Sequence, residues 1–377
     1  MWFTVSQWTA PSFTLLNIAP QIQHTCCGCF NYKRTNTNQT RTAMGDATLC
    51  VALPTQEKPL MVCGHRERIK RGPSTAEGKA TLIKNVTGWE ALLHMKIVLQ
   101  MPGPASGLAS FTPPLVAILP PEEHAACGWL YVEEGDSRPV IEELCRLLSE
   151  RSARAHGYCK ELDEALWNAC FIDVVGNFDR PCVLDLKIGK IRHSPYTSPE
   201  KVQRILMKQH GRTQLVRVCG AYHWYCPSAA SGGGDFVGEF LDKASGYNLH
   251  TSEEHRDIFR AFFSSTIAMK DVKWSKTDAP DKLRVAARVG ACRQRICELL
   301  NYFKSLSGSA LLTQTAFVST SLLFVYDAAE AVDGRADCSR ANVYLIDFAR
   351  CSDRRLNFSE EEVGFVQGLQ STVQLLE

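Results

Sequence analysis

Hydrophobic positions recur along the chain with two different periods, which predict a mixture of strands and helices. Short apolar or alternating runs, typical of strands, occur at 60–71, 79–86, 167–175, 181–189 and 215–225. Pairs of such runs that predict hairpins occur at 111–134 and at 320–327 with 341–350. Helical spacing occurs at 87–99, about 138–156, 198–210, 252–268, about 280–306 and 359–376. We therefore expect an α+β fold, with an N-terminal half rich in antiparallel strands and a mostly helical C-terminal half.

Residues 1–48 differ from the rest of the chain. They are low in periodicity and rich in Thr, Asn and Gln, so we expect a disordered extension, within which Met44 is a second possible start. The remainder of the 377 residues is long enough for two lobes with hydrophobic cores.

Charge and composition argue against several classes of protein. The formal net charge is +2, so the bulk charge indicates neither nucleic acid nor a membrane surface as a partner. No apolar run approaches the roughly 20 residues that a membrane-spanning helix needs. Thirteen of the 16 cysteines are scattered singly, which is typical of buried thiols in a reducing compartment. The one cluster, Cys26, Cys27 and Cys29 beside His24, lacks the second ligand pair that a zinc site needs. We expect a cytoplasmic or nuclear protein.

The segment PCVLDLKIG, residues 181–189, carries an acid and a base in an otherwise apolar strand. Side chains alternate between the two faces of a strand. One face therefore carries only side chains suited to a core, those of Cys182, Leu184, Leu186 and Ile188. Asp185 and Lys187 share the other face with Val183, so the two charged groups project side by side from a rigid element.

Lys84 and Asp347 are candidates for holding a nucleotide and its metal ion. Lys84 lies in the strand predicted at 79–86, with Glu90 in the next helix, and kinase-like folds use such a lysine to hold nucleotide phosphates. Asp347 ends the apolar strand in YLIDFAR, where a carboxylate can hold Mg²⁺ beside phosphate oxygens. Each residue alone also fits a simpler interpretation, as an exposed strand lysine or a turn aspartate.

Basic and imidazole side chains concentrate in residues 187–212, opposed only by Glu200. Within this segment Lys201, Arg204 and Lys208 have the spacing of one helical face. The pattern fits either a solvated basic face or a site for a ligand with several phosphates, because one lysine cannot outcompete water for a highly hydrated anion. A lysine for the nucleotide, an acid for the metal and a basic surface for an anionic acceptor together indicate phosphoryl transfer.

The chain resembles the inositol polyphosphate kinase family. Pro181, Asp185, Lys187 and Gly189 match the family motif PxxxDxKxG in register, and IDFA follows at 346–349. Weaker similarities extend in order over about 50–377, at CGH (63–65), FTP (111–113), FIDVVGNFDRP (171–181), SLLFVYD (321–327) and GFVQGLQSTVQLL (364–376).

The resemblance implies a two-lobed fold with an ATP cleft between the lobes. An antiparallel-sheet N-lobe would span 49–176, with an insertion near 138–160, and a mixed α+β C-lobe would span 177–377.

On the nucleotide side of this cleft, the resemblance implies five contacts. Lys84 would contact the ATP phosphates, and the backbone of Ile172 and Val174 would hydrogen-bond adenine. Asp185 would hold the ribose hydroxyls or, as the alternative, act as a base, and Asp347 would bind Mg²⁺.

On the acceptor side, Lys187 would reach both the transferring phosphoryl group and the accepting hydroxyl. Lys187 and Asp185 are thus the expected catalytic residues, and Lys201, Arg204 and Lys208 would bind the phosphates of the inositol. We expect a monomer whose ligands are ATP and inositol phosphates.

Within the family, RVCG at 217–220 and the pair Arg192–His193 most resemble the inositol hexakisphosphate kinases, which make inositol pyrophosphates. The inositol polyphosphate multikinases are the alternative branch, and a degenerate, polyphosphate-binding scaffold is an alternative of another class. Arg350 stands where the family usually has histidine, which puts the choice of acceptor in doubt.

A protein kinase is the main rival within phosphoryl transfer, because HRD occurs at 255–257 and DFA at 347–349. However, Phe262 stands where the catalytic loop requires asparagine, and the glycine-rich ATP loop is missing. Asp257 is therefore interpreted as a surface residue of a helix.

Overall fold

The structure is a computed structural model that describes residues 68–99, 107–121, 128–132, 137–155, 159–164, 166–208, 214–226, 235–270, 279–331 and 340–377. All of these residues belong to the unit 56–377 of the chain. The extension predicted at 1–48 lies outside the described residues, as do CGH at 63–65 and most of the strand predicted at 60–71.

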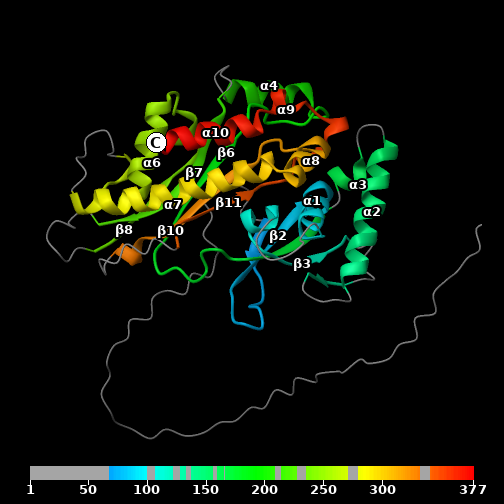
Figure 1. Ribbon diagram of the computed structural model, residues 1–377, viewed down its shortest axis with the longest axis horizontal. Coiled ribbons are helices and arrows are strands. Elements are labelled where there is room, and N and C mark those ends of the chain that lie inside the picture. The colour runs from blue at the N-terminus through cyan, green and yellow to red at the C-terminus, as the bar shows by residue number, and fades with distance from the viewer. Residues whose placement is uncertain are drawn as a thin grey trace, which may run out of the picture. The chain divides into compact units, whose positions relative to one another are not determined.

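The N-terminal part of the described chain is built on a five-stranded antiparallel sheet with the order β1-β2-β5-β3-β4. Its strands are β1 (Ile69–Arg71), β2 (Thr81–Thr87), β3 (Leu115–Leu119), β4 (Leu130–Tyr131) and β5 (Leu166–Ile172). The accompanying helices, beside the sheet in Figure 1, are α1 (Gly88–Leu99), α2 (Ser137–Ala155) and α3 (Lys160–Asp163). Sheet and helices share one hydrophobic core. The antiparallel pairing of the strands confirms the prediction for this half of the chain.

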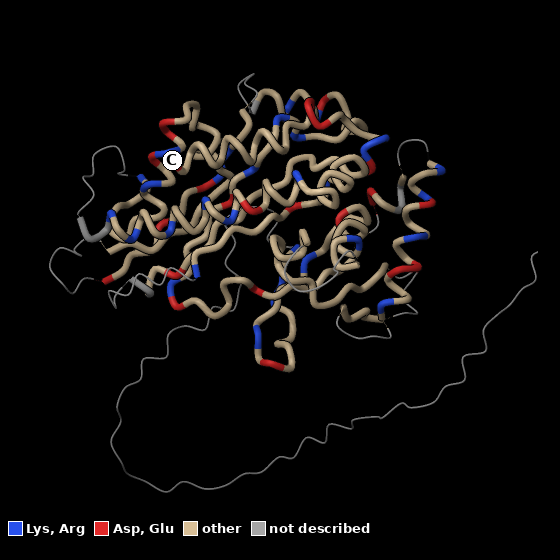
Figure 2. Tube along the Cα trace, in the orientation of Figure 1, with Lys and Arg blue, Asp and Glu red and all other residues tan. Residues whose placement is uncertain are grey.

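The outer face of α2 carries both signs of charge in alternation (Figure 2). Arg146 forms ion pairs with Glu143 at 2.5 Å and with Glu150 at 2.5 Å, and Arg138 pairs with Glu142 at 3.1 Å. Such exposed pairs contribute little stability each but favour a solvated helix. The amphipathic pattern predicted at about 138–156 is confirmed as α2.

The C-terminal part is built on a second five-stranded antiparallel sheet, with the order β11-β10-β6-β7-β8. Its strands are β6 (Pro181–Ile188), β7 (Val216–Tyr225), β8 (Val237–Leu241), β10 (Ser321–Asp327) and β11 (Asn342–Ile346). The helices that share its core are α6 (Ser252–Phe263), α7 (Ala279–Lys304) and α10 (Phe365–Leu375), which run along the sheet in Figure 1.

In this half the helices contain more residues than the strands, as predicted, but the sheet has one strand more than the sequence indicated. The strand missed from the sequence is β8, which lies at the edge of the sheet with Val237 and Phe240 exposed. An edge strand buries neither face fully, so its sequence lacks the apolar alternation on which a strand prediction depends.

β6 lies at the centre of the second sheet, between β10 and β7. Leu184, Leu186 and Ile188 are each 0% exposed in the main core, whereas Val183 packs in a separate cluster on the other face. The two faces predicted for this strand are confirmed. Gly189 has φ of 88°, and a Cβ there would approach the carbonyl oxygen of Val363 to 2.9 Å, so the motif requires glycine where β6 ends.

Several predicted helix boundaries shift for local reasons. The helix predicted to reach 268 ends at Phe263, because Ser264 is extended and its Oγ accepts hydrogen bonds from the N–H groups of Thr266 and Ile267. The helix predicted at 359–376 is divided by Gly364, whose φ of 65° ends the preceding turn.

The remaining elements connect these layers. They are η2 (Leu108–Phe111), α4 (Pro199–Lys208), α5 (Lys243–Tyr247), α8 (Leu306–Gln314), β9 (Thr315–Ala316), η6 (Ala328–Ala331), β12 (Ser352–Asp353), η7 (Arg354–Leu356) and α9 (Glu360–Val363). Ser198 caps α4, since its Oγ accepts a hydrogen bond from the N–H of Lys201 at 3.4 Å. In the described ranges, helices with the length and apolarity to cross a bilayer are absent.

Candidate active site

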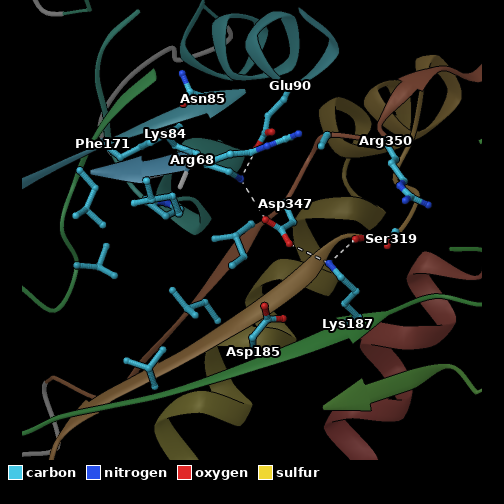
Figure 3. Close-up of a pocket in the computed structure, with 18 of the residues that line it drawn as sticks. Arg68, Lys84, Asn85, Glu90, Phe171, Asp185, Lys187, Ser319, Asp347 and Arg350 are labelled. Carbon is cyan, nitrogen blue, oxygen red and sulfur yellow. Dashed lines mark hydrogen bonds and ion pairs between the residues drawn. The ribbon is translucent and has the colours of Figure 1, made fainter. Parts of the chain in front are cut away.

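A cavity of about 490 Å³ is lined by residues of both sheets (Figure 3). β2 and α1 contribute Lys84 and Glu90, and β6 contributes Asp185 and Lys187. Asp347, directly after β11, lies among them. Strand residues 84, 185 and 187 and the strand-end residue 347 are thus brought to one cavity from distant parts of the sequence.

The carboxylate of Asp347 joins the two halves of the cavity. Its Oδ1 accepts a hydrogen bond from Lys84 Nζ at 3.1 Å, and its Oδ2 accepts one from Lys187 Nζ at 2.9 Å (Figure 3). Lys84 also donates to Glu90 Oε1 at 2.7 Å. Thr87 caps α1, since its Oγ accepts a hydrogen bond from the N–H of Glu90 at 3.3 Å, while the carboxylate of Glu90 pairs with Lys84.

Lys187 is held by a second residue with unusual backbone geometry. Its Nζ donates to the carbonyl oxygen of Ser319 at 3.0 Å and to Ser321 Oγ at 3.0 Å. Ser319 has φ of 58° and Asp347 has φ of 64°, and these are the non-glycine residues with left-handed φ in the described ranges. That conformation costs roughly 1–2 kcal/mol for a residue with a Cβ. Both strained residues contact Lys187, as is typical of functional sites.

The three charges set one another's ionisation. Burial disfavours the charged form of Asp347, but the ammonium groups of Lys187 and Lys84 outweigh burial and lower the pKa of Asp347 well below its usual range. Burial likewise opposes the charge of Lys84, but the carboxylates of Glu90 and Asp347 prevail and raise its pKa. Asp347 and Lys84 are therefore both charged at neutral pH.

Asp185 is 2% exposed and projects from β6 on the same side as Lys187 (Figure 3). The pairing of β6 with β7 shifts here, since Asp185 is opposite Gly220 and Leu186 is opposite Val218. The shift is a β-bulge, a device that redirects side chains beside active sites. Its effect is to place Arg217 opposite Lys187.

One end of the cavity is apolar and is formed by the segment that leaves β5. Phe171, Ile172 and Val174 line it. The N–H of Ile172 donates to the carbonyl oxygen of Pro114 at 2.9 Å, so an adenine contact at Ile172 falls to its carbonyl group rather than its N–H. The structure thus places both predicted adenine residues in the cavity.

The other end of the cavity is cationic. Arg192, Arg217, Lys243 and Arg350 line it, together with Tyr247. Arg192 is 4% exposed and Arg217 is 7% exposed, and the guanidinium of Arg217 stacks over the ring of Tyr247 at 4.5 Å. Arg192 donates to the carbonyl oxygen of Ile188 at 2.7 Å, and Arg350 donates to the carbonyl oxygen of Arg192.

The two buried arginines are weakly balanced by the acids of the described residues, since the attraction of Asp185 for Arg192 is smaller than the opposing effect of burial. Neither Arg192 nor Arg217 forms an ion pair with a carboxylate of the described residues. Burial, and then the like charge of Arg217, lower the pKa of Arg192 to about 9. Uncompensated buried charges are costly, so this end of the cavity is suited to a ligand that brings several negative charges.

With this geometry in place, comparison with known proteins decides the family. Residues 170–377 match the family described as inositol polyphosphate kinase. The chain belongs to the inositol polyphosphate kinase family. The resemblance seen in PCVLDLKIG is thereby confirmed, as is the α+β fold.

Relatives in the family come from two branches. The chain is 32% identical to human inositol hexakisphosphate kinase 1 over 110 residues, which cover 26% of this chain and 25% of that protein. It is 28% identical to human inositol polyphosphate multikinase over 158 residues, which cover 41% of this chain and 30% of that protein. The chain thus matches less than a third of the length of either relative.

Two solved structures align with the chain. An inositol phosphate multikinase aligns over 54% of this chain and 81% of its own, with 23% identity and a TM-score of 0.39. The multikinase Ipk2 of S. cerevisiae, in complex with ADP and Mn²⁺, aligns over 78% of this chain and 97% of its own, with 16% identity and a TM-score of 0.45.

The basic segment predicted to bind inositol phosphates does form a helix, α4, but its basic residues are not in the lining of the cavity. Lys201 and Arg204 lie on α4 and are exposed, and among the residues of α4 it is Ile205 that lines the cavity. Helical spacing puts Lys201 and Lys208 on the same face as Ile205, so their Cα positions flank the one that reaches the cavity. The structure does not bring the three basic residues into the lining itself, and their role stays a prediction.

Arg192 and Arg217 are the site residues that sequence reasoning missed. The signal for Arg217 was available, since it is the one charged residue in the apolar run LVRVCGAYHWY at 215–225. A charge inside a buried strand is rarely tolerated without a ligand or partner. Arg192 was indistinguishable from its neighbours in a generally basic segment.

His94 also lines the cavity, one helical turn after Glu90. Its ring contacts those of Phe171 and Phe348, at centroid distances of 4.8 and 5.0 Å. Burial, and then the charge of Lys84, lower the pKa of His94 to about 3, so it is neutral in the folded protein. His94 therefore adds no charge to the site, whose charged groups are the lysines and carboxylates.

The donor set fits a metal that binds together with phosphate. The described ranges contain no group of three or more His, Cys, Asp or Glu side chains that could enclose an ion. Mg²⁺ usually takes one or two carboxylates plus phosphate oxygens and water, and Asp347 and Asp185 both line the cavity. Both oxygens of Asp347 already bind lysines, so a metal there would displace at least one of them.

Proposed function

We propose that the protein is an ATP- and Mg²⁺-dependent kinase that phosphorylates inositol hexakisphosphate to an inositol pyrophosphate. The observation that carries this proposal is the division of one cavity into an apolar end, a centre built on ion pairs and a cationic end. The apolar end suits a nucleobase, the centre suits the phosphoryl group in transfer, and the cationic end suits a polyanionic acceptor.

Transfer is a direct displacement at phosphorus. An oxygen of the acceptor bonds to the γ-phosphorus of ATP while the bond from that phosphorus to the oxygen bridging to the β-phosphate breaks, which leaves ADP. Lys187 lies between Asp347 and the cationic end and would neutralise charge on the moving group, and Lys84 would hold the ATP phosphates. Mg²⁺, held by Asp347, would neutralise charge on the β- and γ-phosphates.

The nature of the acceptor decides whether a base is needed. When a phosphate oxygen of the acceptor attacks, it carries no proton to be removed, so Asp185 is free to hold the ribose hydroxyls. When an inositol hydroxyl attacks, its proton must leave, and Asp185 is the carboxylate on the same strand face as Lys187. The pyrophosphate-forming reaction therefore needs no general base, whereas phosphorylation of a hydroxyl does.

Two buried arginines that nearby acids balance only weakly support a highly phosphorylated acceptor. Arg192 and Arg217 add to Lys187, Lys243 and Arg350 at one end of the cavity. Each phosphate monoester carries about −1.5 to −2 charges, so five cations around one ligand suit an acceptor with three or more phosphates. The longer alignment with the multikinases, over 158 residues, supports the multikinase reaction as the second candidate.

The test is turnover by the purified full-length protein with Mg-ATP and a panel of inositol phosphates, with products separated by chromatography. We expect inositol hexakisphosphate to be consumed and a more highly charged product to appear. Consumption of the trisphosphate or tetrakisphosphates instead would assign the multikinase reaction. Polyphosphate binding without turnover of any acceptor would indicate a degenerate scaffold, and phosphorylated peptide would indicate a protein kinase. Replacing Mg²⁺ by Mn²⁺ in the same assay tests the metal.

A further inference from the structure

A second cavity, of about 270 Å³, lies against a different face of α1 from the first. Glu90 and His94, one turn apart, line the first cavity. The second cavity is lined on this helix by Trp89, Leu92, Leu93 and Lys96. These two sets point in different directions from the helix axis, so α1 is the wall between the two cavities.

The opposite wall of the second cavity belongs to the segment that follows Asp347. Cys351, Ser352 and Asp353 line it. The cavity is closed by side chains of α2 and of the α8–β9 segment, namely Ser149, Ser152, Thr313, Gln314 and Thr315. An occupant would therefore touch both α1, which carries Glu90, and the segment after Asp347.

The charge in this cavity is positive, because Lys96 and Arg355 line it with one acid, Asp353. Lys96 is half-buried and forms no ion pair or hydrogen bond with any described residue. Asp353 is the acid in the wall, but it already binds Arg355 through two contacts, at 2.6 and 3.0 Å. A second unsatisfied polar group is Ser152, which is 2% exposed and whose hydroxyl has no hydrogen-bond partner within the described ranges.

The remaining lining is apolar. The indole of Trp89 and the side chains of Leu92 and Leu93 form one side, and each of these residues is largely buried. A lysine with no ion pair among the described residues and an aromatic wall in one small cavity match a ligand with one anionic group and one ring or short apolar chain.

We propose that this second cavity is a regulatory site for a small apolar monoanion, whose binding fixes α1 against the segment after Asp347 and so strengthens nucleotide binding. The physical reason is the ion pair between Glu90 on α1 and Lys84. Glu90 orients Lys84, so a ligand that fixes α1 against residues 351–353 holds Glu90, and with it Lys84, in position for the nucleotide phosphates. Preorganisation of that kind raises affinity without a new contact to the nucleotide.

The binding half is tested with 2-naphthoate as the probe, by isothermal titration calorimetry on the full-length protein saturated with ATP. Saturation keeps the probe out of the apolar end and the centre of the first cavity, and the variants at Lys96 and Ser149 distinguish the second cavity from the cationic end of the first. Lys96→Met removes the charge but keeps the apolar stem, and we expect it to weaken binding about tenfold. Ser149→Phe fills the cavity and should abolish binding, whereas Lys304→Met, on the exposed end of α7, is the matched control and should change nothing.

Charge preference gives an independent readout on the unaltered protein. We expect neutral 2-naphthamide to bind about tenfold more weakly than 2-naphthoate, because only the carboxylate can pair with Lys96. Absence of 2-naphthoate binding at millimolar concentration, equal binding of the two compounds, or binding unaffected by Lys96→Met overturns the site.

The regulatory half is tested by nucleotide binding and does not need turnover, so it remains decidable if the proposed reaction is wrong. We expect 2-naphthoate to raise the affinity for ATP severalfold, and ATP to raise the affinity for 2-naphthoate by the same factor, as linkage requires. The effect should vanish in Ser149→Phe. Probe binding with no change in ATP affinity would overturn the coupling.

Discussion

Lys187 and Asp347 are 160 positions apart in the chain, yet their charged groups form an ion pair of 2.9 Å in the centre of the cavity. Lys84 occupies the second oxygen of the same carboxylate at 3.1 Å. A metal ion could therefore bind Asp347 only if at least one lysine left the carboxylate, and the phosphates of a nucleotide would give that lysine a new anionic partner. Under the proposed reaction, metal and nucleotide should bind much better together than separately.

Asp347→Asn should reduce turnover by at least about a thousandfold, because the amide is a poor metal ligand and cannot balance two ammonium groups. Asparagine tolerates left-handed φ, so the backbone at this position should be kept. The ligand-free variant should melt a few degrees lower than the wild-type protein, since Lys84 and Lys187 lose their shared counter-charge. Steady-state kinetics and circular dichroism melting measure both effects.

The matched control for that variant is Asp257→Asn, which changes a carboxylate in the HRD sequence on α6. Asp257 pairs with Arg260 at 2.9 Å on the surface of the helix. We expect near-normal turnover. A large loss in Asp257→Asn, or near-normal turnover in Asp347→Asn, would contradict the assignment of Asp347 as the metal ligand.

Lys187→Ala should lower kcat by roughly a hundredfold to a thousandfold, comparable to the loss of one oxyanion-hole donor. The KM for ATP should change little, because Lys84 retains its contact with the nucleotide phosphates under the proposed roles. Lys187→Arg is a useful partner variant, since it keeps the charge but not the geometry that Ser319 and Ser321 impose. Partial rescue by Lys187→Arg would support electrostatics as the main effect, whereas equal kcat in wild type and Lys187→Ala would exclude Lys187 from the chemical step.

The sequence was most informative where a regular element presents chemistry on one face. The alternation in β6 predicted which residues enter the core and which face the cavity, because the period of a strand is fixed by its backbone. It could not reveal that Asp347 and Ser319 adopt left-handed φ, since that conformation is imposed by tertiary contacts rather than by local sequence.

The cationic end of the cavity marks the limit of the same reasoning. Helical spacing identified Lys201 as a ligand candidate, yet which face of α4 meets the cavity depends on how the helix packs, and there Ile205 makes the contact. Arg217 reaches the cavity through a bulge in β7 that no periodicity predicts. Patterns within one helix or strand thus predicted which kinds of side chain form the site, but not which other helices and strands contribute residues to it.

Arg217→Met should separate affinity for the acceptor from stability. We expect the KM for the inositol phosphate to rise roughly tenfold to a hundredfold, while the KM for ATP stays within about twofold. The ligand-free variant should melt at a higher temperature than the wild type, because a buried guanidinium beside Arg192 is replaced by an apolar chain of similar length.

The comparison variant is the double change Lys201→Ala with Lys208→Ala on α4. It should also raise the acceptor KM more than the ATP KM, but less than Arg217→Met does, because Lys201 is exposed outside the lining. Equal effects on both substrates would contradict an acceptor role for α4, and a larger effect of the double variant would move the acceptor site from β7 to α4.

His94→Met should flatten the acid side of the stability curve. The pKa of His94 is lowered from 6.5 to about 3 in the folded protein, so between these values the unfolded chain binds a proton that the folded chain does not. The free energy of unfolding must therefore fall as pH falls from 6.5 towards 3, by roughly 2 kcal/mol at pH 5 from this residue alone. His255, whose pKa burial also lowers, adds a contribution of the same sign that the variant keeps. Urea unfolding at pH 5 and pH 7.5 measures the change: the loss between these pH values should be smaller in His94→Met by about that amount, and an unchanged loss would mean that His94 takes up its proton without unfolding.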